Sequence, residues 1–362
     1  MFERVFKLSE HKTTVKTEVM AGITTFMTMA YILAVNPSVL GSTGMDTTAV
    51  LLATALASCL GTLCMAFMAT LPFALSAGMG LNAFMAYTVV AGYGYSWQVA
   101  LLAVFIEGLI FIVLSLTNIR EAIFNAIPLT LKKGVSVGIG LFIAFIGLQN
   151  SGLCVDSATL VGIISFPEYF HTAGICALLT LIGLFFTAVF YTRKMKGAIL
   201  YGILLTWILG MLCQVTGLYV PTPDAGFYSL FPSWGMTDFS KLGLTFGQCF
   251  NVDFSAVGIV NFIVVIFSFL FVDIFDTLGT LIGVATKAKM LDKDGKLPGI
   301  KPALLADSIA TSAGAILGTS TTTTFVESAS GVAVGGRTGL TALVTGILFL
   351  VSTLFAPIFT AI

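Results

Sequence analysis

The chain of 362 residues carries 17 basic and 17 acidic side chains, and only 9% of its residues are charged. Hydrophobic residues make up 57% of the sequence, and the mean hydropathy is +1.02. A soluble domain carries roughly 25% charged residues because water must wet its surface, so this composition excludes a soluble globular protein. The zero net charge offers no electrostatic basis for binding nucleic acid.

The cysteines and histidines indicate no metal site and no cofactor. Four of the six cysteines lie in apolar runs and are typical of small packing residues, whereas Cys154 and Cys249 lie in predicted outer loops, where a disulfide is the alternative. The sequence has no CxxC pair, and His11 and His171 lie in separate segments, which argues against structural zinc. The polar N-terminal stretch has mixed charge and is not typical of a cleavable signal peptide.

Eleven apolar stretches follow one another along the chain and predict an all-α polytopic membrane protein, because about 20 apolar residues span a bilayer as a helix. They lie at 19–39, 49–71, 73–92, 96–116, 134–150, 172–191, 197–217, 256–285, 302–319, 321–336 and 338–360. The third, ninth and tenth stretches are the weakest. The connector 218–255 is expected to be an extracytoplasmic loop with an interfacial helix.

The basic residues give an independent check on eleven crossings. Arg4, Lys7, Lys12 and Lys16 predict a cytoplasmic N-terminus by the positive-inside rule. If all eleven stretches cross, the later cytoplasmic connections hold Arg120, Lys132, Lys133, Arg193, Lys194, Lys196, Lys287, Lys289, Lys293, Lys296, Lys301 and Arg337. Only Lys241 of the 17 basic residues then lies outside, so the pattern favours a multi-pass protein of the cytoplasmic membrane.

Two of the weak stretches are interrupted in a way that predicts a transport site. Small and flexible residues at 76–82 break the third crossing, and the hydroxyl-rich, β-branched run at 319–324 breaks the tenth. Extended backbone at membrane depth is tolerated only where protein or a wet cavity covers it. Interrupted segments at matching positions of two halves indicate a transporter's midplane site. Their offset of seven crossings predicts an inverted repeat; two imperfect helices packed on small residues are the alternative.

Five acids lie within apolar runs, and no lysine or arginine lies deep in a crossing to neutralise them. They are Glu107, Asp273, Asp276, Asp307 and Glu327. An ionisable group at this depth is costly and is a functional candidate, and a medium of low dielectric favours the proton-bound form of a carboxyl group. Asp273 and Asp276 share one helix face and are expected to titrate as a coupled pair.

Each acid also has a purely structural interpretation. Glu107 is expected to hydrogen-bond across a helix interface, and Asp307 to cap its helix or pair with Lys301. Glu327 directly follows the threonine run, at the start of an expected half-helix whose dipole favours the ionised carboxylate. Asp273 and Glu327 lie where several signals meet and are the leading functional candidates, ahead of Asp276.

Two segments resemble the signatures of adenine/guanine/hypoxanthine permeases. They are FVDIFDTLGT at 271–280, and the segment from GTS at 318–320 through ESASG at 327–331. These permeases are a subfamily of the nucleobase–cation symporter-2, or xanthine/uracil permease, family. The strings GGRTGL at 335–340, AGITTF at 21–26 and GMGLNA at 78–83 match as well. The resemblance runs over essentially the whole chain.

The resemblance implies a fold of fourteen crossings in two inverted sevens, with half-helices at crossings three and ten, and elevator-type symport of a purine base with a proton. It implies substrate binding by Asp273, Glu327 and Asn82 with Asp276 close by; Thr24, Thr324 and Ser328 in the same motifs are further candidates. Asp273 and Glu327 are the proton-coupling candidates. A carboxylate and an amide together can accept from and donate to the edge of a purine.

The resemblance also predicts how the chain divides into domains. Residues 1–116 (crossings 1–4) and 256–362 (crossings 8–11) are expected to form the core domain, and 117–217 (crossings 5–7) the first half of a gate. The sequence ends at Ile362, whereas relatives continue for three more crossings. A truncated fragment that binds bases but does not transport them is therefore the alternative.

Other classes fit less well. An intramembrane aspartyl protease needs acids on two helices and a Gly-x-Gly-Asp string, which is absent. In an anion transporter of similar architecture, acids at the site would repel the substrate. The sequence leaves open the preferred purine, proton against sodium coupling, and a homodimer.

Overall fold

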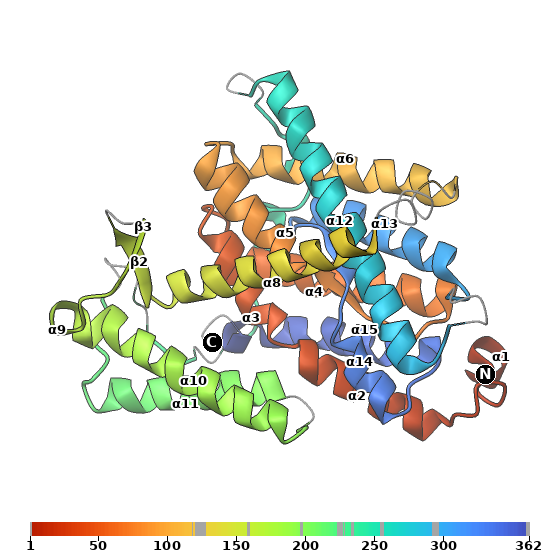
Figure 1. Cartoon of the computed structure of the whole chain (residues 1–362), viewed down its shortest axis with the longest axis horizontal. Helices are drawn as coiled ribbons and strands as arrows, with labels where there is room; N and C mark the ends of the chain where they lie inside the picture. The colour runs from red at the N-terminus through yellow and green to blue at the C-terminus, as the bar shows by residue number, and fades with distance from the viewer. Residues whose placement is uncertain are drawn as a thin grey trace.

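Helices dominate the computed structural model, which describes residues 2–117, 119, 128–157, 160–195, 198–222, 227, 229–232, 235–253, 257–291 and 297–359 (Figure 1). The predicted cytoplasmic residues Arg120, Lys196, Lys293 and Lys296 lie outside these ranges. Helix starts follow local sequence rules: Thr14, Asp46, Ser96 and Thr338 each accept a backbone N–H of the helix that follows. Such caps satisfy donors that the first helical turn leaves unpaired.

Eight helical segments in the described part of the chain are long and apolar enough to cross a membrane. They are Val15–Gly41, Thr47–Ala69, Trp97–Leu116, Phe166–Thr192, Ala198–Val215, Ile259–Thr286, Ile300–Leu317 and Gly339–Phe359. They coincide with eight of the eleven predicted crossings. The remaining three predicted crossings correspond to 73–92, 134–150 and 321–336, of which 134–150 lies within helix α8 (Leu129–Asn150).

The first and last thirds of the chain pack into one body. Its helices are α1 (Phe2–Phe6), α2 (Val15–Met29), α3 (Ile32–Gly41), α4 (Thr47–Cys64), α5 (Met79–Ala83), α6 (Trp97–Leu116), α12 (Ile259–Ala288), α13 (Ile300–Leu317), α14 (Ser328–Val334), α15 (Gly339–Ser352) and α16 (Ala356–Phe359). The π-helical segments η1 (Met65–Ala69) and η2 (Phe84–Gly92) extend α4 and α5, and the 3₁₀ turn η7 (Thr353–Phe355) precedes α16. Helix α13 packs on α4 and α6, and α15 packs on α2 and α4. Small residues permit this closeness: a Cβ on Gly61 would lie 2.6 Å from Cβ of Ala310.

A second group of helices lies to one side of that body (Figure 1). Helices α10 (Ile175–Thr192) and α11 (Ala198–Val215) run side by side, and α8 reaches toward them through the hairpin of β2 (Cys154–Ser157) and β3 (Leu160–Ile163). The short helix α9 (Phe166–Tyr169) and the π-helical turn η3 (Phe170–Gly174) lead into α10. The α10–α11 pair lies within the predicted residues 117–217, whereas α8, from the same range, also contacts α5 and α12 of the core body.

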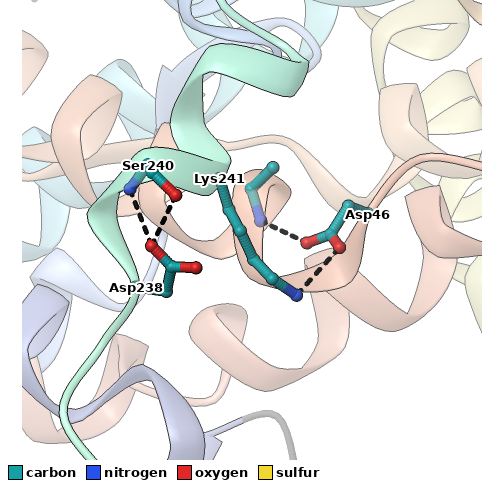
Figure 2. A network of polar contacts seen from close by, with 5 residues as sticks. Asp46, Asp238, Ser240 and Lys241 are labelled. Atoms are coloured by element: carbon teal, nitrogen blue, oxygen red, sulfur yellow. Dashed lines mark hydrogen bonds and ion pairs between the residues drawn. The ribbon is translucent and has the colours of Figure 1, made fainter.

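The connector predicted to contain an interfacial helix holds two 3₁₀ turns, η5 (Phe239–Leu244) and η6 (Gln248–Phe250). Lys241 Nζ lies 3.0 Å from Asp46 Oδ2 at the start of α4, as Figure 2 shows. At the end of α13, Gly247 N donates to Ile316 O at 2.7 Å and Thr245 Oγ1 to Leu317 O at 2.9 Å. The connector therefore closes one end of two core helices. Cys154 and Cys249 are both free thiols.

Two short strands lie inside the core body. Strand β1 (Leu75–Ala77) pairs antiparallel with β4 (Thr322–Thr324), with Ser76 opposite Thr323. The pairing continues beyond the strands, since Gly78 N donates to Thr321 O and Phe325 N to Ala74 O. All six strand residues are buried. Each interrupted stretch thereby satisfies the backbone groups of the other, which extended chain inside a membrane protein requires.

Candidate substrate site at the paired strands

Each strand leads directly into a short helix, so two helix N-termini lie at the paired strands. Helix α5 follows β1 after the N-cap residue Gly78, and α14 begins one residue after Glu327, which occupies the N-cap position. Backbone N–H groups at helix N-termini favour negative charge and hydrogen-bond acceptors. The two sequence interruptions, more than 240 positions apart, are thus brought together at one place.

A cavity of about 260 Å³ opens at this point. It is lined by Tyr31, Gly78, Met79, Gly80, Asp276, Thr280, Thr324, Phe325, Val326 and Glu327. Another hollow, beside α12, is lined by Val264, Phe267, Ser268, Phe271 and Val272, and it brings no ionisable group together. The cavity at the strands combines carboxyl, hydroxyl and apolar groups, the mixture that small-molecule sites use.

Glu327 lies at the cavity wall and is oriented by a tyrosine that the sequence analysis did not single out. Tyr31 donates its hydroxyl hydrogen to Glu327 Oε1 at 2.8 Å. The Glu327 side chain makes no capping hydrogen bond to its own helix, so the expected half-helix start is occupied but the carboxylate is turned toward α2 and α3. In the sequence, Tyr31 stands out only as a residue with a polar hydroxyl inside the apolar stretch 19–39.

Asp276 and Thr324 complete the polar wall. A Cβ placed on Gly78 would lie 3.4 Å from Asp276 Oδ2, so this carboxyl group lies beside the backbone of Gly78; the same Cβ would come within 2.7 Å of Thr323 Cγ2, which favours glycine here. The Thr324 hydroxyl is buried and has no hydrogen-bond partner among the described residues. A buried hydroxyl without a partner is costly, and here it lines a cavity where a ligand could supply one.

Asp273, the other acid of α12, is fully buried and is not among the cavity-lining residues. Thr277 Oγ1 lies 2.9 Å from Asp273 Oδ1, 3.1 Å from Asp307 Oδ2 and 2.8 Å from Thr323 Oγ1. Asp307 Oδ1 also accepts the backbone N–H of Thr324 at 3.2 Å. The expectation that Asp307 caps its own helix is wrong, because Gly299 is the N-cap of α13 and Asp307 lies deep within it.

Side chains from five different helices hold the residues of the hydroxyl-rich run, one after another. The contacts join Thr319 to Asn36, Ser320 to Asn82, Thr321 to Glu107, the carbonyl of Thr322 to Thr311, Thr323 to Thr277, and the amide of Thr324 to Asp307. Glu107 was expected to bond across an interface between helices; its carboxylate instead accepts the hydroxyl of Thr321 in the extended run. Each residue of the run is therefore held by a hydrogen bond to a side chain of a surrounding helix, which stabilises its extended backbone.

The remaining predicted site residues lie around this arrangement. Asn82 is buried and contacts Ser320 through its Oδ1 atom, with Met79 Sδ 4.0 Å from its Nδ2 atom. Ser328 Oγ accepts the amide of Ala74 at 3.0 Å, and Thr24 donates to Met20 O within α2. Of the predicted residues, Asp276, Glu327 and Thr324 line the cavity. Asp273, Asn82, Ser328 and Thr24 are not among the lining residues.

Known proteins with similar sequences are transporters. Residues 16–362 match the Permease family. A guanine/hypoxanthine permease of Bacillus subtilis is 46% identical over 367 residues, covering 99% of this chain and 79% of the relative. An adenine permease of Escherichia coli is 42% identical over 362 residues, covering 99% and 76%.

Solved structures agree on the fold. The transmembrane domain of the cyanobacterial bicarbonate transporter BicA superimposes with a TM-score of 0.64 at 16% identity, covering 95% of this chain and 83% of that one. The structure of SLC26A9 superimposes with a TM-score of 0.55 at 13% identity, covering 99% and 59%. The chain belongs to the Permease family: it is a multi-pass membrane protein of a transporter family, not an enzyme, and the resemblance drawn from its motifs is confirmed.

Proposed function

We propose, on the premise of this family membership, that the chain carries a purine base across the cytoplasmic membrane together with a proton. The observation that carries the proposal is the cavity at the paired strands, with Glu327, Asp276, Tyr31 and Thr324 on its wall. Carboxylates accept the N–H groups of a purine, and a hydroxyl both donates and accepts. Adenine, guanine and hypoxanthine are the substrate class, as the names of the relatives suggest.

Proton coupling would use the acids behind and beside the cavity. Thr277 has one hydroxyl hydrogen, yet its oxygen contacts carboxyl groups of both Asp273 and Asp307 as well as the Thr323 hydroxyl. Every contact is satisfied if the Thr323 hydroxyl donates to Thr277 Oγ1, Thr277 donates to one carboxylate, and the other carboxyl group is protonated and donates to Thr277 Oγ1. Asp273 and Glu327 are the proposed coupling residues, with Asp307 sharing the proton of Asp273 through Thr277.

Transport would follow from an elevator-type movement of the core, residues 1–116 and 256–362, against a gate that includes 117–217. The proposed topology has eleven crossings with a cytoplasmic N-terminus, and the units β1–α5 and β4–α14 are the half-helix crossings three and ten of an inverted repeat. The antiparallel pairing of β1 with β4 supports this relation, since an odd offset of crossings inverts the second copy.

Uptake of radiolabelled adenine, guanine, hypoxanthine and uracil into cells that express the chain tests the proposal. Purine uptake is expected to stop with a protonophore and to fall at least about tenfold in Glu327→Ala, because the carboxylate that Tyr31 orients is lost. Asp273→Ala and Asp276→Ala are expected to behave similarly. Asp156→Ala, which removes an exposed acid on β2, is the matched control and should transport normally.

Four outcomes would contradict parts of this proposal. Normal uptake by Glu327→Ala and Asp276→Ala would disprove the site, and competition by uracil alone would disprove the substrate class. Purine binding by the purified chain without any uptake would favour the fragment that binds but does not transport. Sodium-dependent uptake that a protonophore leaves intact would replace the proton as the coupling ion.

A further inference from the structure

Two motifs of the sequence lie outside the cavity, and the structure places them against each other. They are AGITTF at 21–26, in α2, and GGRTGL at 335–340, in the turn between α14 and the start of α15. Helix α2 packs along both α14 and α15. In Figure 1 the three helices lie together at the side of the molecule where the N-terminus is marked.

Glu18, in the first turn of α2, is fully buried and is bound by this turn. Its carboxylate accepts the amide of Arg337 at 2.9 Å, the amide of Thr338 at 3.3 Å and the hydroxyl of Thr341 at 2.6 Å. These groups lie at the start of α15, where the helix dipole favours a negative charge. A buried carboxylate with three donors holds its neighbours firmly, because losing it would remove the partner of the Arg337 and Thr338 amides and leave Thr341 only the Glu18 carbonyl, at 3.3 Å.

The side chain of Arg337 binds the C-terminal end of α14, whereas its backbone amide binds Glu18. Its Nη1 atom donates to the carbonyl oxygens of Val332 and Gly336, each at 2.7 Å. These carbonyls lie at the C-terminal end of α14, where a positive charge is favourable. Gly335, the C-cap of α14, has a φ of +116°, a conformation that glycine adopts readily. A Cβ there would also lie 2.8 Å from Thr17 Cγ2 of α2.

The N-terminal end of α14 lies at the cavity, and residues at the end of α2 and just after it contact this end as well. Thr28 Oγ1 lies 2.8 Å from Ser330 Oγ, and Tyr31 donates to Glu327. Between the two ends, a Cβ on Gly331 would lie 2.7 Å from the carbonyl oxygen of Ala21. Helix α14 has only seven residues, too few to be stable alone, so its position is set by what lies along it.

We propose that Glu18 and Arg337 are positioning residues for Glu327: they fasten the far end of α14 to α2, and α2 then sets where α14 presents its first residue to the cavity. The span from Glu18 to Tyr31 is about 20 Å at 1.5 Å per residue, so neither residue touches a ligand. This inference rests on the proposed function in taking Glu327 as the substrate-binding acid.

Two measurements on the full chain in lipid nanodiscs test it. In Glu18→Ala, hydrogen exchange of the amides at 327–334 is expected to accelerate at least about tenfold, because the attachment of α14 to α2 is weakened. The dissociation constant for tritiated guanine, hypoxanthine or adenine is expected to rise about tenfold, because a small displacement of a binding group is costly. Arg337→Met should do the same, and Arg337→Lys should recover part of the loss.

A matched control separates positioning from general loss of stability. Asp46→Ala removes the side-chain N-cap of α4, and it should lower the melting temperature without changing exchange at 327–334 or purine affinity. If Glu18→Ala lowers the melting temperature while both exchange and affinity stay at the wild-type values, the inference is overturned. If the wild type binds no purine, the proposed function fails, and faster exchange at 327–334 in Glu18→Ala would still support the role of Glu18 in fixing α14.

Discussion

The core body and the α10–α11 pair use the same residue types in opposite ways. In the core, some hydroxyl groups bond only their own helix, but others join distant segments, as Thr277 does to Asp307 and Thr323. In the pair, threonines bond the backbone of their own helix: Thr180 donates to Cys176 O and Thr187 to Gly183 O. A hydroxyl that bonds its own helix specifies no partner. In the pair, the close approach comes instead from glycines, since a Cβ on Gly202 would overlap Thr187 and one on Gly183 would overlap Thr206.

Exposed apolar side chains lie on the helices of both regions, and the clearest contrast is with the hydroxyl-rich run of the core. On α10 and α11, Leu184, Phe185 and Leu212 are each more than half exposed, as suits lipid contact or another helix surface. Residues 319–324 in the core are at most 2% exposed. The complete burial of this run is consistent with the proposed core domain acting as one body.

The largest expected effect comes from adding one methyl group at a glycine, and it contrasts the core with helix α8. A Cβ on Gly339 would overlap the backbone carbonyl of Ala66, and Gly339→Ala should destabilise the protein by about 3 kcal/mol through overpacking. Gly140→Ala, in α8, meets open space and should stabilise by about 0.5–1 kcal/mol because alanine favours helix. Thermal unfolding of both purified variants checks this, and equal melting temperatures would remove the contrast.

Replacing a threonine by valine should distinguish the two regions less strongly. Thr277→Val leaves Asp273, Asp307 and Thr323 without a shared partner and should cost about 1–2 kcal/mol, with loss of purine uptake. Thr180→Val removes only a bond within α10 and should change stability by less than about 0.5 kcal/mol. Melting temperature and uptake, measured on the pair, would contradict this if Thr277→Val transported as well as Thr180→Val.

The smallest effect is expected where the connector meets the core, at Asp46 and Lys241. Burial of Asp46 opposes ionisation, but the amide of Ala49 and the ammonium group of Lys241 outweigh it and hold the pKa below its usual value. The ionised form therefore stabilises the fold at neutral pH, and this contribution is lost as the pH falls below about 4. Lys241→Met should cost at most about 1 kcal/mol, because the pair is partly exposed.

Melting curves at several pH values check this pair. The difference in melting temperature between wild type and Lys241→Met should be present at pH 7, shrink with added salt, and shrink as the pH falls below about 4. A difference that stayed undiminished at pH 3 would mean that the aliphatic part of Lys241, rather than its charge, stabilises the connector.

The sequence predicted the parts of the site better than their assembly. The break at 76–82, the run at 319–324 and the acids of α12 were all visible in a single sequence, because small residues, hydroxyls and charges are rare inside apolar stretches. It did not show that the two breaks pair as strands, since pairing joins residues separated by more than 240 positions. Nor did it show that Asp276 rather than Asp273 lines the cavity, because two acids three residues apart share a helix face and only the neighbours of α12 distinguish them.

By itself, the sequence determined the membrane environment, the helices and where they are broken, since these depend on the cost of burying polar groups in lipid, which composition and order alone fix. The tertiary structure decided which partners those polar groups have. Tyr31 faces Glu327, Asp307 holds the amide of Thr324, and Glu18 binds the turn at Arg337. A hydrogen bond requires atoms within about 3 Å of each other in a suitable direction, and only the packed helices bring such distant residues that close.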